Sequence, residues 1–397
     1  MKKGWKIALW CLVAAAPVAL IVGLSVPNTS IKNISTVGST DLKPFIEPLA
    51  EEYSKQHSEY DITVESGGSD FGIEETAYGL ANIGNLTKNS FSKVKDSFKQ
   101  EWIDRSMKTV TLAWEGICVV YIPPQGISAD AKSKLNTILD MNSTTIGNLY
   151  RTFSGFKDGL GQDKPTMGLF LKSGVITDPT DLGLFQNQEV IPFARSGGYI
   201  TSGTTSSFYN DSHFDFDTTT LSDRQQSAFK FGNYGDDWRV YDTDEANTRA
   251  WDLFSSYNLP GSMVYLSSGF VKQNIKLIQN AGYGVFSYNG VEFAVDKINT
   301  ASGYNFYHPL NMTLSIEDQK ARGFVDFLVD ASYKDKWEMM GARQIIASEY
   351  DSMTNDGTST GELWSSDIVV SNRRYGTTFW DTPTGGPVVF GAIDTNA

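Results

Sequence analysis

The sequence has few of the residues that hold metals or disulfide frameworks. It contains two cysteines and three histidines in 397 residues. Cys11 and Cys118 are far apart in the chain, and the HExxH and CxxC patterns are absent. These absences argue against a zinc enzyme and against a disulfide-stapled domain. We therefore expect no metal and no cofactor. A GxSxG motif is also absent, which argues against the commonest serine hydrolases.

An excess of positive charge is lacking as well. The formal net charge is −13, so nucleic acid and anionic lipid headgroups are poor candidates for the main partner. An anionic ligand would have to be held by a local site against the overall field. Apolar residues make up 40% and aromatic residues 13% of the chain, which is enough for packed cores in two or three domains.

The N-terminus is the one long apolar run. Three lysines stand within residues 1–6, and Ile7 to Val26 carries no charge. This run is longer than a usual signal-peptide core and suits a bilayer crossing. Signal-peptide cleavage is disfavoured because Pro17 would directly follow the best cleavage site. Lipidation of Cys11 is disfavoured because the apolar run before it is very short. We predict an uncleaved membrane anchor over residues 1–26, with a cleaved signal as the alternative, then a linker over 27–33. The remainder is expected outside the cytoplasm.

Two stretches combine a strand, a Gly/Ser turn and a helix. In "VGSTDLKPFIEPLAEEY" (37–53) apolar residues recur with helical spacing from Leu42, so Ser39, Thr40 or Asp41 is expected to cap a helix. In "ESGGSDFGIEETAYGL" (65–80) a turn that contains Ser69 and Asp70 follows an alternating strand. Repeated units of this kind predict an α/β domain with a mostly parallel sheet. Ligands gather at the carboxyl ends of such strands.

A third Gly/Ser-rich turn carries an arginine. In "ARSGGYITSGTTSSFYN" (194–210), Arg195 precedes two clusters of small polar residues. A planar guanidinium can meet two oxygens of a tetrahedral anion at once, while glycines let backbone N–H groups approach closely. The donors that these clusters offer are Ser196, Gly197, Ser202, Gly203 and Thr204. The three turns together predict a clamp for an oxyanion.

Later segments outline the rest of the chain. "TVTLAWEGICVVYIPP" (109–124) reads as a long apolar strand that crosses between domains, and 280–298 reads as a returning strand pair. Residues 317–341 have helical spacing and predict two helices. Ala321, Phe324, Val325 and Leu328 form one face of the first. The tail from 350 to 397 is polar and rich in glycine and shows no clear period.

These segments, in this order, resemble the phosphate-binding protein of bacterial ABC importers. The resemblance rests on the three turns, on "LAWEGICVVYIPP", and on "GSMVYLSSG", "NAGYGVFSYNG", "YNFYHPL" and "FVDFLVDASYKDKWEMMG". It covers about residues 34–124 and 191–345. It implies a two-lobed α/β fold of the periplasmic-binding-protein-like type II class, with a hinge between the lobes. Lobe 1 would comprise residues 34–112 and 290–345, lobe 2 residues 118–285, and 346–397 a C-terminal extension. The crossings would lie near 112–120 and 284–294.

The resemblance also implies a function without catalysis. The protein would capture inorganic phosphate and deliver it to an ABC transporter permease, as a monomer attached to the membrane by its N-terminus. The implied phosphate contacts come from the three turns: Ser39, Thr40 and the Asp41 backbone, Ser69 and Asp70, then Arg195, Ser202, Gly203 and Thr204. Open alternatives are another oxyanion, such as sulfate or molybdate, and a surface adhesin or antigen that retains the fold.

Two departures from the family pattern affect the predicted site. About four extra residues separate Arg195 from Ser202, so Ser196 and Gly197 are alternative contacts. Thr87 stands where many members supply a carboxylate. We expect Asp41, rather than Asp70, to replace it as the acceptor for the proton of phosphate.

Overall fold

The structure of the protein is a computed structural model. It describes residues 31–87, 96–142, 145, 148–149, 152–153, 165–195, 241–243, 247–300, 302–345 and 389–390. The predicted anchor at residues 1–26 lies outside these residues. Among the helices that are described, none has the length and apolar character needed to cross a membrane.

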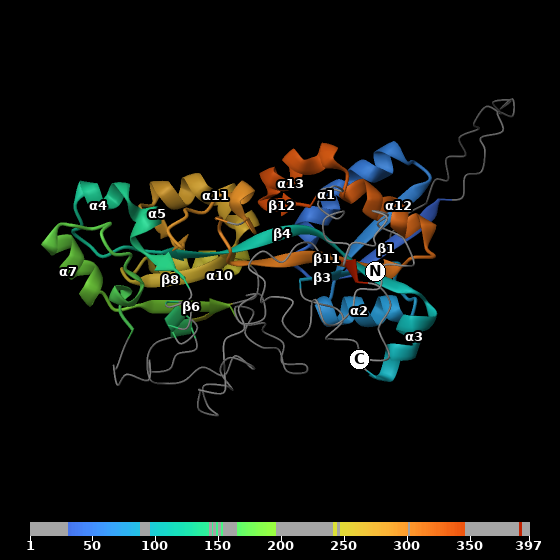
Figure 1. The fold of residues 1–397 in the computed structure, drawn as a ribbon, viewed down its shortest axis with the longest axis horizontal. Coiled ribbons are helices and arrows are strands. Elements are labelled where there is room, and N and C mark those ends of the chain that lie inside the picture. Colours follow the sequence, from blue (N-terminus) through green and yellow to red (C-terminus); the bar gives the residue numbers. More distant parts are fainter. Residues whose placement is uncertain are drawn as a thin grey trace, which may run out of the picture.

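One curled sheet runs through the described part of the molecule in the order β2-β1-β3-β11-β4-β8-β6-β7 (Figure 1). Its first group of strands is β1 (Lys32–Gly38), β2 (Tyr60–Ser66), β3 (Ile83–Leu86), β11 (Tyr307–Ser315) and β12 (Ala342–Gln344). Its second group is β6 (Ile191–Arg195), β7 (Tyr241–Thr243), β8 (Ser262–Ser267) and β9 (Gly284–Val285). Within the first group β1 pairs in parallel with β2 and β3, and within the second β6 pairs in parallel with β7 and β8. The predicted α/β class is confirmed.

Strand β4 (Met107–Tyr121) belongs to both groups, as expected for the long apolar run. It pairs with β11 as far as Gly116 and with β8 from Ile117 onward, both antiparallel. The crossing that was predicted near 284–294 falls between β10 (Ser287–Tyr288), whose Tyr288 is buried in a core of the second group, and Val295, which is buried in the core of the first. β10 pairs in parallel with β5 (Asp140–Met141), and Asn289 and Gly290, which have positive φ, form the turn that follows it.

The chain passes between the groups once more where β11 begins. Phe306 is buried in the core of the second group, and Tyr307 is buried in the core of the first. Tyr307 pairs with Gly116 of β4, so this crossing and the one along β4 lie side by side.

Helices cover both faces of the first group (Figure 1). Helices α1 (Lys43–Gln56), α12 (Gln319–Leu328) and α13 (Lys334–Met340) lie on one face, and α2 (Ser69–Ala77) and α3 (Lys99–Asp104) on the other. The predicted face of α12 is confirmed, because Ala321, Phe324, Val325 and Leu328 are all buried. Phe45 of α1 stacks on Trp337 of α13 with ring centroids 5.7 Å apart.

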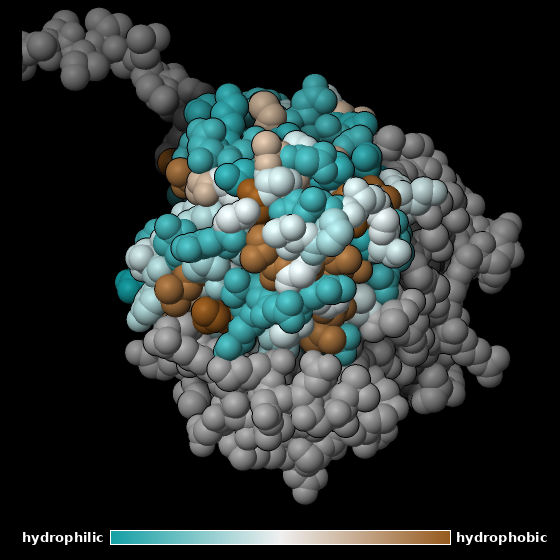
Figure 2. Space-filling view, turned by 90° about the vertical axis from the view of Figure 1, so that its left-hand side faces the viewer, coloured by the Kyte–Doolittle hydropathy of each residue, from teal (hydrophilic) through white to brown (hydrophobic). Residues whose placement is uncertain are grey.

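The second group is covered by α4 (Ala129–Ser133), α5 (Leu135–Ile138), α7 (Pro179–Asn187), α10 (Asn247–Tyr257) and α11 (Ser268–Asn280). Short 3₁₀ turns complete the described elements: Asp96–Phe98, Met167–Phe170, Val295–Lys297 and Ala331–Tyr333. Figure 2 shows the end of the molecule formed by this group, where apolar residues lie among hydrophilic ones. The apolar side chains of the group fill two buried clusters, one on each side of β4 and β8.

Part of the C-terminal segment joins the sheet. Strand β13 (Val389–Phe390) pairs antiparallel with Thr109 and Val110 of β4. Strand β12 pairs with β4 at residues 113–115. The chain beyond α13 thus contributes two strands to the sheet, β12 and β13, and both pair with β4.

We expect Gly38, the last residue of β1, to be irreplaceable. Its φ is +136°, and an added Cβ would lie 2.2 Å from the carbonyl oxygen of Asn85. Gly38→Ala should destabilise the fold by about 2–4 kcal/mol, because it adds backbone strain to a clash with another strand. Gly126→Ala is the matched control, with φ at +81° and open space around the new Cβ. It should cost about 1–2 kcal/mol. Equal losses in thermal or chemical unfolding would contradict the clash.

Candidate binding site

The carboxyl ends of β1, β2 and β3 meet at one edge of the first group. The Gly38 carbonyl accepts hydrogen bonds from the N–H groups of Gly67 and Gly68, at 2.8 and 2.9 Å. Ser39 donates its N–H to the Asn85 carbonyl at 2.7 Å. The first two predicted turns are therefore brought together, and the end of β3 joins them.

Ser69 is buried at this junction and contacts Thr87. The Ser69 hydroxyl oxygen accepts the N–H of Thr87 at 3.2 Å, and the two hydroxyl oxygens lie 3.4 Å apart. Ser69 is the first residue of α2, whose N-cap is Gly68. The junction thus offers two hydroxyl groups beside a helix N-terminus, which favours an anion.

Helix α1 begins later than expected, so the predicted caps are wrong. Its N-cap is Leu42, with no side-chain hydrogen bond, and the Leu42 carbonyl accepts from Phe45 and Ile46. A turn over residues 40–42 and Pro44 in the first helical turn place the helix start beyond the polar cluster. The Ser39 hydroxyl instead accepts the N–H of Asp41 at 3.3 Å.

The predicted residues of the first two turns differ in exposure. Ser39 and Ser69 are buried, Asp41 is half-buried, and Thr40 and Asp70 are exposed. Asp70 does not cap α2 either, because it lies within the first turn of that helix. Its carboxylate is suitably placed for the positive end of the helix dipole.

The second group also directs its strand ends toward the crossings. β6 and β8 are parallel, and Ser267 at the end of β8 pairs with Ile117 of β4. Arg195 is the last residue of β6, at that same end. Ser196, Gly197, Ser202, Gly203 and Thr204 lie outside the described residues.

The starts of α10 and α11 lie together at this end. Asn247 of α10 accepts the N–H of Ser267 at 2.9 Å and donates to its hydroxyl at 3.2 Å. The Ser267 hydroxyl in turn accepts the N–H of Phe270, which caps α11. Side-chain hydrogen bonds thus fix the start of α11 in the second group.

A cavity of about 280 Å³ lies between the two groups. Residues of the first group line one side: Thr40, Asp41, Pro44, Phe45 and Met340. Residues of the second group line the other: Asn247, Thr248, Ser267, Gly269, Phe270 and Gln273, with Glu115 of β4 at the crossing. The cavity is therefore continuous with the first predicted turn, and we call it the inner cavity.

Glu115 and His308 form a buried pair where the chain crosses between the groups. They face each other across β4 and β11, with His308 Nε2 2.8 Å from Glu115 Oε2. The Gly269 N–H donates to Glu115 Oε1 at 3.4 Å. Burial raises the pKa of Glu115, and the nearby Asp41 charge adds to this rise, whereas the contact with His308 opposes it.

Sequence reasoning did not identify Glu115 or His308 as site residues. The available signal was a single carboxylate in the apolar run "LAWEGICVVY". A buried, unpaired carboxylate is costly, so its presence there required a partner from elsewhere in the chain.

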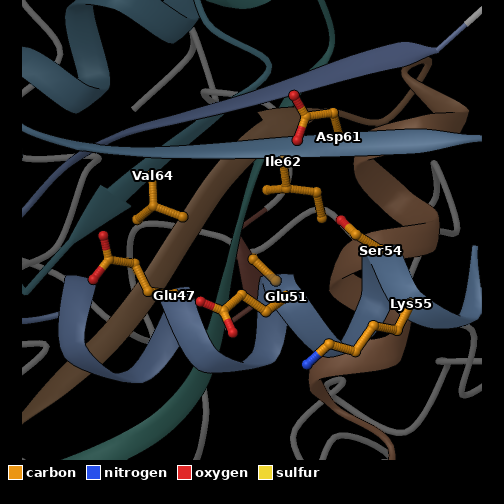
Figure 3. A pocket seen from close by; sticks show the side chains of 8 residues that line it. Glu47, Glu51, Ser54, Lys55, Asp61, Ile62 and Val64 are labelled. Atoms are coloured by element: carbon orange, nitrogen blue, oxygen red, sulfur yellow. The ribbon is translucent and has the colours of Figure 1, made fainter. Parts of the chain in front are cut away.

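A second cavity, of about 450 Å³, lies on the outer side of the first group (Figure 3). It is formed between α1 and the edge strand β2, with Ile62 and Val64 directed toward the helix. Its lining carries three carboxylates and one lysine: Glu47, Glu51, Asp61 and Lys55. It lacks the converging strand ends of the inner cavity and therefore is the weaker candidate for an anion site.

No cluster of three or more histidine, cysteine or acidic residues that could hold a metal occurs in the described part of the chain. The strand-end hydroxyls and helix N-termini are therefore the groups on which a ligand site can be argued.

Comparison with known proteins places the chain in a broad family. The model of the PBP superfamily domain matches residues 25–332. An uncharacterized lipoprotein of Mycoplasma genitalium is 29% identical over 372 residues, which cover 87% of this chain and 93% of the relative.

Two solved structures are similar at low identity. One is PstS from Borrelia burgdorferi, 18% identical, with a TM-score of 0.47, covering 79% of this chain and 99% of that one. The other is an ABC-type phosphate transport receptor from Vibrio cholerae, 17% identical, with a TM-score of 0.49, covering 79% and 100%.

The buried pair predicts a pH-dependent stability. Because the pKa of Glu115 is raised in the folded state, folding favours its protonated form. The stabilisation from this bound proton is complete below the ordinary pKa of 4.5 and is lost as the pH rises through the raised value. Glu115→Gln removes this titration, so wild type should lose stability relative to the variant as the pH rises above about 5.

Thermal unfolding between pH 5 and 8 measures this difference. Glu51→Gln, which removes an exposed carboxylate from α1, is the control. Its stability should change with pH in the same way as that of wild type. A stability difference between wild type and Glu115→Gln that is constant with pH would contradict the prediction.

Proposed function

The chain belongs to the PBP superfamily, and on this premise we propose that it captures inorganic phosphate outside the cytoplasm for an ABC transporter permease. One observation carries the proposal. The turns that hold Ser39 and Ser69, predicted separately as phosphate-binding, are held together by hydrogen bonds at the ends of β1, β2 and β3. Strand ends of this kind are where open α/β sheets bind ligands.

The proposed binding mode uses neutral donors and one cation. The hydroxyls of Ser69 and Thr87 and the N-terminus of α2 would contact the anion from the first group. Arg195, at the end of β6, would supply the positive charge from the second. Short-range dipoles in a site that excludes water hold an anion without a positive protein surface. The net charge of −13 is therefore compatible with phosphate capture.

We propose that the two groups of strands act as lobes. Residues 34–112 and 290–345 would form lobe 1 and residues 118–285 lobe 2, with the 346–397 extension attached to β4 through β13. The bending points would be Gly116–Ile117, where β4 changes partner, and Phe306–Tyr307 on the adjacent crossing. Closure about these points would enclose the anion, as hinge motions do in binding proteins.

We place the working part of the protein outside the membrane, attached through residues 1–26. The relative in Mycoplasma genitalium is described as a lipoprotein, which supports attachment to a membrane. It also keeps Cys11 open as a lipidation site beside the uncleaved anchor that the apolar run favours. We propose a monomer with the permease as partner, with no enzymatic step.

Sulfate is the second candidate ligand, because of Thr87. This residue places a hydroxyl beside Ser69, whereas a carboxylate there would accept the proton of phosphate and repel sulfate. Calorimetry on the full-length protein with phosphate and sulfate decides between them. Binding of neither anion would refute the proposal and favour a retained fold with another role.

Arg195 should dominate the affinity for phosphate. Arg195→Ala removes a charge-assisted hydrogen bond worth about 1.5–3 kcal/mol, so the affinity should fall at least about tenfold. Arg195→Lys should recover only part of the loss, because an ammonium does not reproduce the bidentate guanidinium contact. Titration calorimetry measures both. As the control, Arg322→Ala removes the same charge from α12 and should leave the affinity for phosphate unchanged. If Arg195→Ala binds phosphate as tightly as wild type, Arg195 does not contact the anion.

Asp41 should contribute to discrimination between phosphate and sulfate. It is half-buried, lines the inner cavity and can accept the proton that phosphate, unlike sulfate, retains at neutral pH. Asp41→Asn should reduce the ratio of phosphate affinity to sulfate affinity by more than it reduces the phosphate affinity itself. Asp70→Asn, on an exposed residue of the first turn of α2, should mainly lower stability. Competition calorimetry compares the two, and unchanged rejection of sulfate in Asp41→Asn would leave that residue without this role.

A further inference from the structure

The inner cavity contains features that inorganic phosphate does not require. Its charged lining residues are Asp41 and Glu115, and the described residues that line it include no lysine or arginine. Glu115 is 1% exposed and is paired with His308. Among the described residues that line the cavity, no cationic side chain therefore balances Asp41. The interior of the cavity favours a hydrogen-bond donor or a positive charge over an anion.

Aromatic and apolar groups form its walls. Phe45 and Met340 line one side and Phe270 the other. Phe45 is held by stacking on Trp337, and Phe270 contacts Trp251 with ring centroids 5.9 Å apart. Aromatic faces attract ammonium groups, and apolar walls suit a short methylene chain. Rings that are fixed by neighbouring tryptophans lose little freedom when a ligand binds.

The size of the cavity agrees with a small organic group. At about 280 Å³ it approaches the lower end of pockets that hold small molecules, about 300–1,000 Å³. A phosphate ion at the strand ends would leave this volume to water. Thr40 and Asp41 border the cavity and also belong to the first predicted phosphate turn. A phosphate ester that is held at that turn could extend its substituent into the cavity.

We propose that the cleft binds a phosphate monoester of an amino alcohol. This inference rests on the proposed function, because the phosphate group would occupy the same strand-end donors. The ammonium lies between the carboxylates of Asp41 and Glu115, and the methylene groups contact Phe45 and Phe270. Glu115 thereby selects the ester without contributing to the binding of free phosphate, whereas Asp41 serves both ligands.

Calorimetry on the full-length protein tests this with three probes: inorganic phosphate, ethyl phosphate and phosphoethanolamine. The two esters differ mainly in the ammonium. We expect phosphoethanolamine to bind at least about tenfold tighter than ethyl phosphate. Glu115→Gln should reduce this ratio at least about fivefold while it still binds inorganic phosphate, which reports an intact fold. Phe270→Leu keeps an apolar wall but removes the aromatic face, so it should also lower this ratio. It provides the test if Glu115→Gln does not fold.

The outcomes separate this inference from the proposed function. If phosphate binds and the two esters bind equally, the ammonium site is refuted and phosphate capture stands. If none of the three probes binds, phosphate capture is refuted and the ester site falls with it. Glu51→Gln removes one carboxylate of the outer cavity and is the matched control for net charge (Figure 3). If Glu51→Gln lowers the preference for phosphoethanolamine over ethyl phosphate as much as Glu115→Gln does, the effect comes from the overall charge and the proposal is overturned.

Discussion

The pairing of β4 with β11 is the constraint on which the rest of the structure depends. It places Glu115 opposite His308 at the point where the chain passes between the two groups of strands. Both side chains are buried, so each requires the other to offset the cost of removing a polar group from water. The register between β4 and β11 is therefore fixed by this side-chain pair as well as by the backbone hydrogen bonds.

The same junction connects helices of the two groups. The Ser268 hydroxyl donates to the Gly341 carbonyl at 2.6 Å and accepts the N–H of Gly116 at 2.7 Å. The start of α11 is thereby joined to the end of α13 and to β4. If the two groups move as the proposed lobes, the pivot would lie near this point, where helices of both groups and β4 are joined. Because residues of both groups line the inner cavity, such a movement would change its shape.

Local patterns in the sequence predicted much of this fold, and long-range pairings were beyond them. The apolar face of α12 and the long strand β4 were identified because periodicity and apolar runs report burial directly. The passage at Phe306–Tyr307 was not predicted, because the local pattern of "NFYHPLNM" does not show which core each residue enters. The expected cap of α1 failed because Pro44 and the turn before Leu42 move the helix start past the polar cluster. For the site, the Gly/Ser turns located the strand ends, but Glu115 acquires its role only through His308, distant in sequence.

The distribution of charge explains how an acidic chain can hold an anion beside two carboxylates. At the strand ends the groups that would contact the anion are hydroxyls and backbone N–H groups, which carry no net charge and act over short distances. Glu115 lines the inner cavity at the crossing and is bonded to His308. The cleft is thereby divided into a donor-rich edge and an acceptor-rich interior, and a ligand with one anionic end and one donor end matches both.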